Sequence, residues 1–382
     1  MLSTRIIFVR HGRSTYNEQG RYQGSSNQAV LIADGYRTAR LVGQALQAEK
    51  IDAIYASPLK RVQQTVEVIR EQLPHDECAI AFREDLREID LPAWEGLPYE
   101  TVRTHQVDDY RCWIERPHEF QMAPIPQAES FYPVRDLYQR AQQFWQDVLP
   151  GNAGKTLLVV SHGGTIHALI STALGLTPDQ HHCLQQSNCG ISILEFTTQT
   201  NTVQLSQMND TGILGEVLPK LKAGRQGLRL LFLPVEPNTL MSGVCSLLEL
   251  VHLDFSLQTH GLISDFQTAQ LLKNHPETVP LQIQRDDFIQ VWQQTLTLRQ
   301  QSEGLLITGL IIASPQQVED LLRQIVGIPT RAEEALTVSP GKISVVHYAD
   351  SQPRPILQGL NIHTSKLDQN ANCGKQTLLA TV

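Results

Sequence analysis

Short apolar runs alternate with helix-like segments along the first half of the chain. The run at residues 5–9 is almost wholly apolar, which is typical of a strand buried on both faces. Runs at 53–56 and 157–160 predict two further strands. Apolar residues at helical spacing predict intervening helices at 35–48, 61–73 and 165–174, the last closed by Gly175. This alternation predicts an α/β fold with a mostly parallel sheet flanked by helices.

The second half of the chain repeats part of this pattern. Residues 6–9 correspond to 230–233 at an offset of 224, and residues 159–160 and 191–194 correspond to 311–312 and 343–346 at an offset of 152. Any two strand–helix–strand units share some likeness, but colinear matches at both ends of each half favour a duplication. Because the offsets differ by 72 residues, the second copy would lack about that much of the interior. We predict one domain at 1–220 and a truncated copy of the same fold at 228–382.

The composition narrows the class of protein. The chain has 382 residues, 41% of them hydrophobic and 18% charged, which suits two folded domains. A net charge of −8 argues against a nucleic-acid partner. No apolar run approaches the roughly 18 residues that cross a bilayer, and no secretory signal is evident, so no membrane partner is expected. Six cysteines without a CxxC pair argue against a disulfide framework or a zinc cluster and favour a cytoplasmic location.

Polar side chains suited to an anion follow each of the three predicted strands. Arg10 and His11 come directly after 5–9, and His162 follows 157–160. The third strand leads into Ser57-Pro58, so that Arg61 falls in the first turn of the next helix. Guanidinium groups and helix N-termini bind phosphate oxygens, and open α/β sheets bind ligands where strands end. We therefore expect one shared crevice, although each motif alone could be a surface turn, a helix cap or a solvated charge.

Together these motifs resemble the histidine phosphatase superfamily, which contains cofactor-dependent phosphoglycerate mutases and many metal-free phosphatases. The resemblance covers roughly residues 5–210. Its further carriers are Ser14, Thr15, Asn17, Gln23-Gly24, Thr65, residues 86–89 and 94–96, and Glu129-Ser130. The stretches Cys112-Trp113 and 186–190 look like two-domain cyanobacterial or plastid-type members that act as carboxyarabinitol-phosphate phosphatases. Metal-free phosphoserine phosphatases of the superfamily are also similar.

The resemblance implies a catalytic role for five residues and no metal or cofactor. His11 would take the phosphoryl group as phosphohistidine, and an adjacent cation such as Arg10 would keep it neutral for attack. Arg10, Arg61 and a protonated His162 would clamp the phosphoryl oxygens. Glu88 would protonate the leaving group, with Glu84, Asp85, Asp90 and Glu95 as nearby rivals. The expected substrate-binding residues are Asn17, Gln23, Gly24, Arg13 and Gly163.

The substrate is less well defined by the sequence. Residues 105–135 interrupt the α/β pattern with four prolines and predict a cap over the site. Arg13 stands where many family members carry glutamate, which indicates an acidic small phosphorylated metabolite, either phosphoserine-like or a sugar-acid phosphate. We expect a phosphomonoesterase, with a phosphoglycerate mutase and a noncatalytic phospho-ligand-binding or regulatory protein as alternatives. A homodimer is a further open alternative.

The second copy lacks the residues that would bind phosphate. At the offset of 224, His11 corresponds to Val235, and at the offset of 152, His162 corresponds to Ser314. The apolar strand and helix positions remain. The sequence therefore predicts a noncatalytic second domain that keeps the core but not the site.

Overall fold

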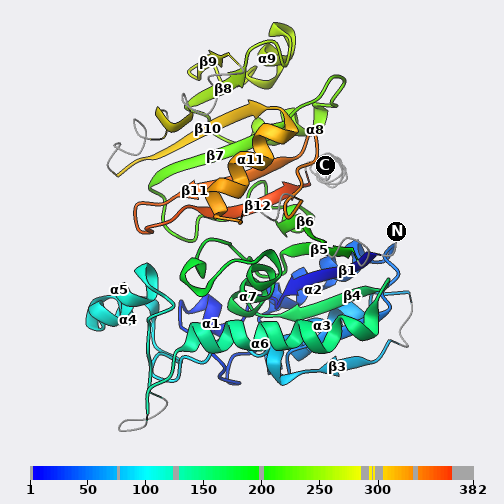
Figure 1. The fold of residues 1–382 in the computed structure, drawn as a ribbon, viewed down its shortest axis with the longest axis vertical. Coiled ribbons are helices and arrows are strands. Elements are labelled where there is room, and N and C mark those ends of the chain that lie inside the picture. Colours follow the sequence, from blue (N-terminus) through cyan, green and yellow to red (C-terminus); the bar gives the residue numbers. More distant parts are fainter. Residues whose placement is uncertain are drawn as a thin grey trace, which may run out of the picture. The chain divides into compact units, whose positions relative to one another are not determined.

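A computed structural model describes residues 3–74, 78–123, 129–197, 202–284, 292–294, 296, 304–329 and 334–363. The chain divides into two compact units. The first comprises Met1–Ser206 and Ile328–Ala335, and the second comprises Gln207–Gly327 and Leu336–Val382 (Figure 1). Each unit is an α/β structure with strands and helices of its own. No helix among the described residues is both long and apolar enough to span a membrane.

The first unit is built on a sheet whose order is β3-β2-β4-β1-β5-β6. Its strands are β1 (Ser3–Arg10), β2 (Ala53–Ala56), β3 (Ile80–Phe82), β4 (Thr156–Ser161), β5 (Ile191–Thr197) and the start of β6 (Thr202–Asp210). The pairs β1–β4, β2–β4 and β2–β3 are parallel, and β1–β5 is antiparallel. The predicted α/β fold with a mostly parallel sheet is therefore confirmed for the first unit.

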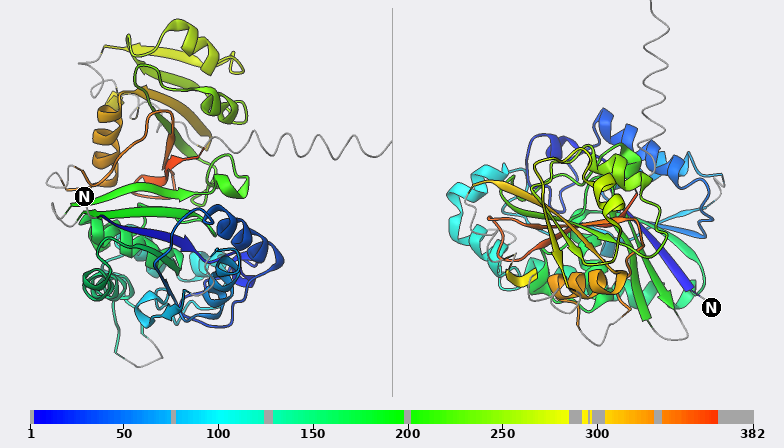
Figure 2. Two further views of the ribbon diagram at one scale, coloured as in Figure 1. Left: turned by 90° about the vertical axis from the view of Figure 1, so that its right-hand side faces the viewer. Right: turned by 90° about the horizontal axis from the view of Figure 1, so that it is seen from above.

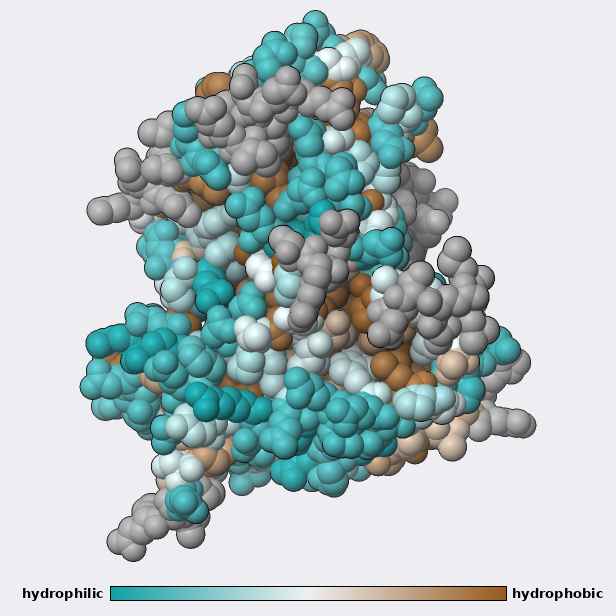
Figure 3. Space-filling model, viewed as in Figure 1, coloured by the Kyte–Doolittle hydropathy of each residue, from teal (hydrophilic) through white to brown (hydrophobic). Residues whose placement is uncertain are grey.

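Helices cover both faces of the first sheet (Figure 2). They are α1 (Thr15–Glu18), α2 (Ala33–Ala45), α3 (Lys60–Arg70), α4 (Tyr99–His105), α5 (Val107–Glu115), α6 (Pro133–Val148) and α7 (Gly163–Leu174). Helices α2 and α3 pack together, as do α6 and α7. In α6, Leu137, Ala141 and Phe144 are buried at helical spacing, and its polar residues form the hydrophilic band across the lower part of Figure 3.

The predicted strands and helices lie close to the observed ones, with shifts of a few residues at the ends. Strand β2 has the predicted bounds, and α7 ends at Gly175, whose φ of 76° is the left-handed conformation that glycine adopts without strain. Residues 105–135, the expected cap, contain the helix α5. The scattered prolines of this region gave no indication of a helix. Residues 124–128 of that region lie outside the described residues.

The second unit has a sheet in the order β12-β11-β7-β10-β8-β9. Its strands are β7 (Gly227–Pro234), β8 (Phe255–Thr259), β9 (Val279–Ile283), β10 (Leu306–Ala313), β11 (Ile343–Tyr348) and β12 (Ile356–Ile362), and its helices are α8 (Ser242–Leu248), α9 (Asp265–Leu271) and α11 (Pro315–Val326). The pairs β7–β10, β8–β10 and β8–β9 are parallel, whereas β7–β11 and β11–β12 are antiparallel. Leu231, Leu310 and Val345 lie in its apolar core.

Candidate active site

The register of two neighbouring strands brings the two predicted histidines together. Strands β1 and β4 are parallel and pair Arg10 with Ser161, so the next residue of each chain segment, His11 or His162, leaves the sheet at the same edge. The ring centroids of His11 and His162 are 5.3 Å apart, with 62° between the planes. Both side chains are almost completely buried. The two imidazoles thus lie together at the strand ends, as expected.

A backbone contact selects the tautomer of His11. Its Nδ1 lies 2.8 Å from the carbonyl oxygen of Gly12. Because a carbonyl oxygen only accepts hydrogen bonds, Nδ1 carries a proton, so in the neutral imidazole the lone pair lies on Nε2. The backbone amide of Gly12 donates to Thr65 Oγ1 at 3.0 Å, which holds this turn. A Cβ on Gly12 would lie 2.6 Å from the oxygen of Gly35, so no larger residue fits there.

Arg61 is held in a buried position at the start of α3. Its Nη1 donates to the carbonyl oxygen of Ser26 and its Nη2 to that of Gly24, both at 2.8 Å, and its Nε has no hydrogen-bond partner within the described part of the chain. Burial, with a contribution from Arg10, lowers the pKa of Arg61 to about 10, so the group is still charged at neutral pH. Gly24 has a φ of 51°, and a Cβ there would lie 2.5 Å from Glu95 Oε1. The geometry gives Gly24 a role in orienting Arg61.

Arg10 approaches from the end of β1. Its Nη1 donates to the carbonyl oxygen of Gln186 at 2.8 Å. Its Nε is buried and lacks a hydrogen-bond partner among the residues that the structure describes. Burial lowers the pKa of Arg10, although the charge of Glu88 opposes this shift. Arg10 and Arg61 therefore bring two buried guanidinium groups to this site, an arrangement suited to an anion.

His162 is buried beside these cations as a neutral imidazole. Its Nε2 lies 2.8 Å from Ser57 Oγ, and its Nδ1 has no hydrogen-bond partner over the described ranges. Burial holds the pKa of His162 well below 6.5, and the charges of Arg61 and Arg10 act in the same direction. The expectation of a protonated His162 therefore does not hold for the protein by itself. A phosphate dianion beside the ring would oppose this shift.

The carboxylate of Glu88 lies at the N-terminus of α7. Its Oε1 accepts from the amide of Thr165 at 3.2 Å and its Oε2 from the amide of Gly164 at 3.3 Å. A Cβ on Gly164 would lie 2.6 Å from Glu88 Oε1, so this contact requires glycine. Because the first amides of a helix have no partner inside the helix and carry partial positive charge, they fix a carboxylate here.

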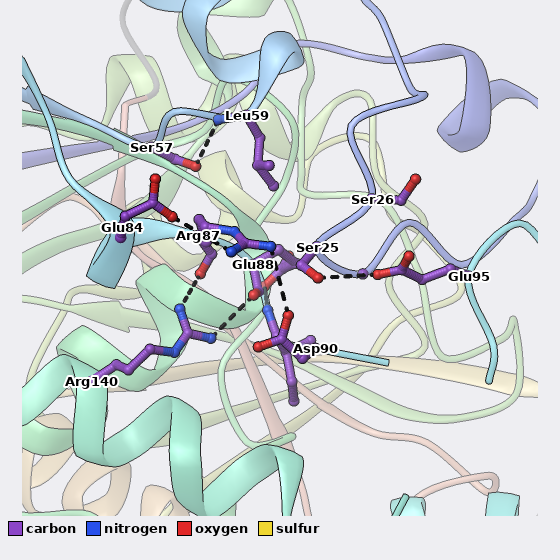
Figure 4. A network of polar contacts seen from close by, with 12 residues as sticks. Ser25, Ser26, Ser57, Leu59, Glu84, Arg87, Glu88, Asp90, Glu95 and Arg140 are labelled. Carbon is purple, nitrogen blue, oxygen red and sulfur yellow. Dashed lines mark hydrogen bonds and ion pairs between the residues drawn. The ribbon is translucent and has the colours of Figure 1, made fainter. Parts of the chain in front are cut away.

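The rival carboxylates of the same region have other partners. Glu84 and Asp90 lie 3.5 and 4.0 Å from the guanidinium of Arg87, as Figure 4 shows. Asp85 is paired with Arg83, and Glu95 Oε1 accepts from Ser25 Oγ at 3.2 Å. Among these described carboxylates, Glu88 is the one bonded to the helix that begins after His162. The geometry favours Glu88 as the acid of this site.

The predicted substrate-binding residues differ in their contacts and in their exposure to solvent. Asn17 Oδ1 accepts from the amide of Ser14 at 3.2 Å, and Gln23 Oε1 accepts from Ser14 Oγ at 2.8 Å. Gly163 begins α7, and a Cβ there would lie 3.3 Å from Arg10 Nε. Arg13 is half-exposed and forms an ion pair with Glu18 at 2.7 Å. A role for Arg13 toward substrate therefore remains a prediction.

Two residues near the cluster were not predicted. Asn188 Nδ2 donates to the carbonyl oxygen of His11 at 2.9 Å and to Asn17 Oδ1 at 3.2 Å. The Tyr99 hydroxyl is hydrogen-bonded to the side chain of Asn17, and its pKa is raised chiefly by burial while the charge of Arg10 opposes the shift. Asn188 lies in the 186–190 stretch quoted above, but Tyr99 has no signal beyond its place at the start of α4.

A second group of buried histidines lies beside α7. His167 and His181 are stacked with centroids 4.9 Å apart, and Trp113 of α5 lies 4.8 Å from His182. His182 Nε2 donates to the Trp113 carbonyl oxygen at 2.8 Å. No group of three or more His, Cys, Asp or Glu residues suited to a metal ion occurs in the described structure.

We expect this histidine group to make the first unit acid-sensitive. Burial lowers the pKa of His167 to about 3 and that of His182 to about 4, from 6.5 in an exposed imidazole. The unfolded chain therefore binds more protons below pH 6.5, and each such imidazole should lower the free energy of unfolding by about 1.4 kcal/mol per pH unit as the pH falls toward 5. Urea unfolding at pH 7, 6 and 5 measures this slope. His167→Phe should reduce the slope and the exposed control His105→Ala should not; an unchanged slope in His167→Phe would contradict the assignment.

Comparison with known proteins identifies a family that matches the part of the chain that bears this site. The family described as histidine phosphatase superfamily (branch 1) matches residues 6–211. The chain is 37% identical over 211 residues to a probable 2-carboxy-D-arabinitol-1-phosphatase of Arabidopsis thaliana, covering 54% of this chain and 42% of that protein. It is 34% identical over 272 residues to the 2-carboxy-D-arabinitol-1-phosphatase of Triticum aestivum, covering 70% and 52%. The chain thus spans about half the length of these two plant proteins.

Bacterial and structural relatives match the same half of the chain. Phosphoserine phosphatase 1 of Hydrogenobacter thermophilus is 30% identical over 212 residues, which cover 56% of this chain and 95% of that protein. A crystal structure of phosphoserine phosphatase from Entamoeba histolytica in complex with 3-phosphoglyceric acid aligns with a TM-score of 0.47 and 26% identity, covering 55% of this chain and 99% of that one.

Proposed function

Because the chain belongs to the histidine phosphatase superfamily (branch 1), we propose that it is a phosphomonoesterase that forms a phosphohistidine at His11. The observation that carries this proposal is the tautomer of His11, whose Nδ1 is committed to the carbonyl oxygen of Gly12. This leaves the Nε2 lone pair for attack, in a cluster that also contains His162, Arg10 and Arg61. A neutral imidazole needs no activating base for this attack.

The proposed reaction has two steps. In the first, His11 Nε2 forms a bond to phosphorus while the ester oxygen leaves and takes a proton from Glu88. Arg10, Arg61 and His162 bind the phosphoryl oxygens, where charge is concentrated during transfer. In the second, water attacks the phosphohistidine, its proton passes to the Glu88 carboxylate, and inorganic phosphate leaves. Glu88 is then protonated again and ready for the next turnover.

We propose a small phosphate ester that also bears a carboxylate as the substrate. Support comes from the relatives, which are named for 2-carboxy-D-arabinitol 1-phosphate and for phosphoserine. Both molecules combine a phosphate ester with a carboxylate. In this chain, Arg13 would bind that carboxylate by giving up its ion pair with Glu18, which is half-exposed and therefore weak.

A panel of esters tests the function and the substrate class together. The full-length protein, treated with EDTA, is assayed for phosphate release from phosphoserine, 3-phosphoglycerate, sugar-acid phosphates and neutral sugar phosphates. We expect release without added metal, and a kcat/KM up to about fivefold higher for the carboxylate-bearing esters, since an ion pair with half-exposed Arg13 contributes roughly 0.2–1 kcal/mol. Transfer of phosphate between positions of phosphoglycerate, with little free phosphate, would identify a mutase instead. Saturable binding without turnover of any ester would refute both activities.

We also propose that residues 228–382 are a truncated, noncatalytic copy of the first unit. The support is topological: β3-β2-β4-β1-β5-β6 in the first unit corresponds, strand by strand in chain order, to β9-β8-β10-β7-β11-β12 in the second. The parallel and antiparallel pairs also correspond. Where His162 precedes α7, Ser314 precedes α11 and caps it through a hydrogen bond from the amide of Gln317. Ser314→Ala should therefore leave phosphate release unchanged.

A further inference from the structure

The short segment that carries Glu88 is fastened through its backbone carbonyls. Ser161 Oγ donates to the carbonyl oxygen of Leu86 at 2.8 Å, and Thr165 Oγ1 donates to that of Arg87 at 2.7 Å. From α6, Arg140 donates with Nη1 to the carbonyl oxygen of Arg87 at 2.8 Å and with Nη2 to that of Glu88 at 3.1 Å. Figure 4 shows both of these contacts. One guanidinium thus spans two consecutive peptide groups at the proposed acid.

We propose that Arg140 is a positioning residue for the proton transfer by Glu88, an inference that rests on the proposed phosphatase function. By fixing the peptide groups on both sides of the Glu88 Cα, Arg140 limits rotation of the residue that must reach the leaving oxygen. Two parallel N–H donors from one planar group set an orientation that a single donor does not. The backbone contacts of Arg140 orient Glu88 without occupying its carboxylate oxygens, which contact α7 instead.

The charge of Arg140 is retained although the group is partly buried. Burial lowers the pKa of Arg140, and the nearby charges of Asp90 and Glu88 oppose that shift. An uncharged donor could make the same carbonyl contacts at less cost in desolvation. A cation here also disfavours protonation of His162, to whose lowered pKa Arg140 contributes. The same side chain therefore acts on the geometry of the acid and on the charge of the phosphate-binding histidine.

A neighbouring arginine, Arg83, also links the segment that carries Glu88 to α6. Arg83 Nη2 donates to Asp147 of α6 at 2.8 Å and also bonds Asp85. It thus ties the same segment to the same helix, but in the described structure its hydrogen bonds go to these two aspartates and not to Glu88. Arg83→Gln is consequently the matched control for Arg140→Gln. Both variants remove an arginine that links residues 83–88 to α6, and only one removes a contact to the acid.

The test compares esters with poor and good leaving groups. An alkyl ester such as phosphoserine needs a proton on its leaving oxygen, whereas p-nitrophenyl phosphate releases a stable phenolate. Arg140→Gln should lower kcat/KM for the alkyl ester by roughly 10- to 100-fold and for p-nitrophenyl phosphate by less than about 3-fold, because only general-acid catalysis is impaired. Arg83→Gln should lower neither by more than about 3-fold, since Arg83 bonds Asp85 and Asp147 and not the proposed acid. Equal losses of the two esters in Arg140→Gln would overturn the proposal.

A double-mutant cycle separates positioning from stability. In a Glu88→Gln background the acid is gone, so Arg140→Gln should have almost no further effect on the alkyl ester. Full additivity would show that Arg140 acts independently of Glu88 and would overturn the proposal. Melting temperatures of the variants identify any loss of folded protein. Absence of turnover in the unmodified protein would instead refute the proposed function, a result distinct from an active protein that is insensitive to Arg140→Gln.

Discussion

Replacing His11 with alanine should lower kcat by at least about 10⁴-fold, because removal of an attacking nucleophile abolishes the covalent route. The expectation rests on the Nδ1 contact to Gly12, which leaves Nε2 as the attacking atom. The measurement is phosphate release by the full-length protein, together with alkaline-quench trapping of labelled protein from an ester that carries the radiolabel on its phosphate. Unmodified protein should retain an acid-labile, base-stable label, and His11→Ala should retain none.

The control for this prediction is an exposed histidine of the same unit. His105→Ala, at the end of α4, should keep both activity and label, because its ring contacts only neighbouring residues of that helix. If His11→Ala kept more than about a tenth of the activity, the nucleophile would lie elsewhere. Since the second unit has no histidine at the equivalent strand end, the loss in His11→Ala should be complete for the whole chain.

Arg61→Gln should lower kcat/KM by roughly 10²- to 10³-fold, as expected when a preorganised donor to the transferring group is lost. Arg61 is fully buried, and its two terminal nitrogens are committed to the carbonyl oxygens of Ser26 and Gly24. Arg61→Lys keeps a positive charge but lacks the planar guanidinium with its paired N–H donors. We therefore expect it to recover less than about a tenth of the lost activity. Steady-state kinetics on the best ester of the panel measures both variants.

Arg37→Gln provides the control for the arginine substitutions. Arg37 is exposed on α2 and pairs with Asp34 of the same helix, so its loss should change kcat/KM by less than about twofold. Because Arg61→Gln removes the donors to the carbonyl groups of Ser26 and Gly24, a loss of stability of about 1–3 kcal/mol is also expected. Thermal unfolding separates this loss from catalysis. Full activity in folded Arg61→Lys would show that a positive charge alone is sufficient and would contradict the requirement for a guanidinium group.

The elements that bear the site were predictable because local sequence is enough to specify them. A continuous apolar run such as 5–9 has no stable position except inside a sheet covered on both faces. Gly175 ends α7 because a left-handed residue at that point favours glycine. The motif around His11 and that around His162 each follow such a strand, so their arrival at one sheet edge follows from parallel pairing. The family match over residues 6–211 agrees with that inference.

Contacts between distant segments were beyond the reach of the sequence. The chemistry of the residues does not distinguish Glu88 from Asp90, and only the motif position favoured Glu88. In the fold, what separates them is that α7 begins where the Glu88 carboxylate lies. Arg13 was assigned to substrate from its place in the motif, yet a nearby glutamate is its partner in the fold. His181 stacks on His167, and the ring of His182 lies edge-on to Trp113. These contacts were not predicted, because they join separate segments of the chain.

The sequence by itself determined which elements form and which residues stand at the strand ends, because backbone propensity and apolar periodicity are local properties. Only the tertiary structure decided which carboxylate meets a helix N-terminus and which arginine holds the peptide groups beside it. Arg140 and Glu88 are 52 residues apart and lie on different elements. Hydrogen bonds and charge interactions act over a few ångströms in space, so their partners are chosen by packing and not by distance along the chain.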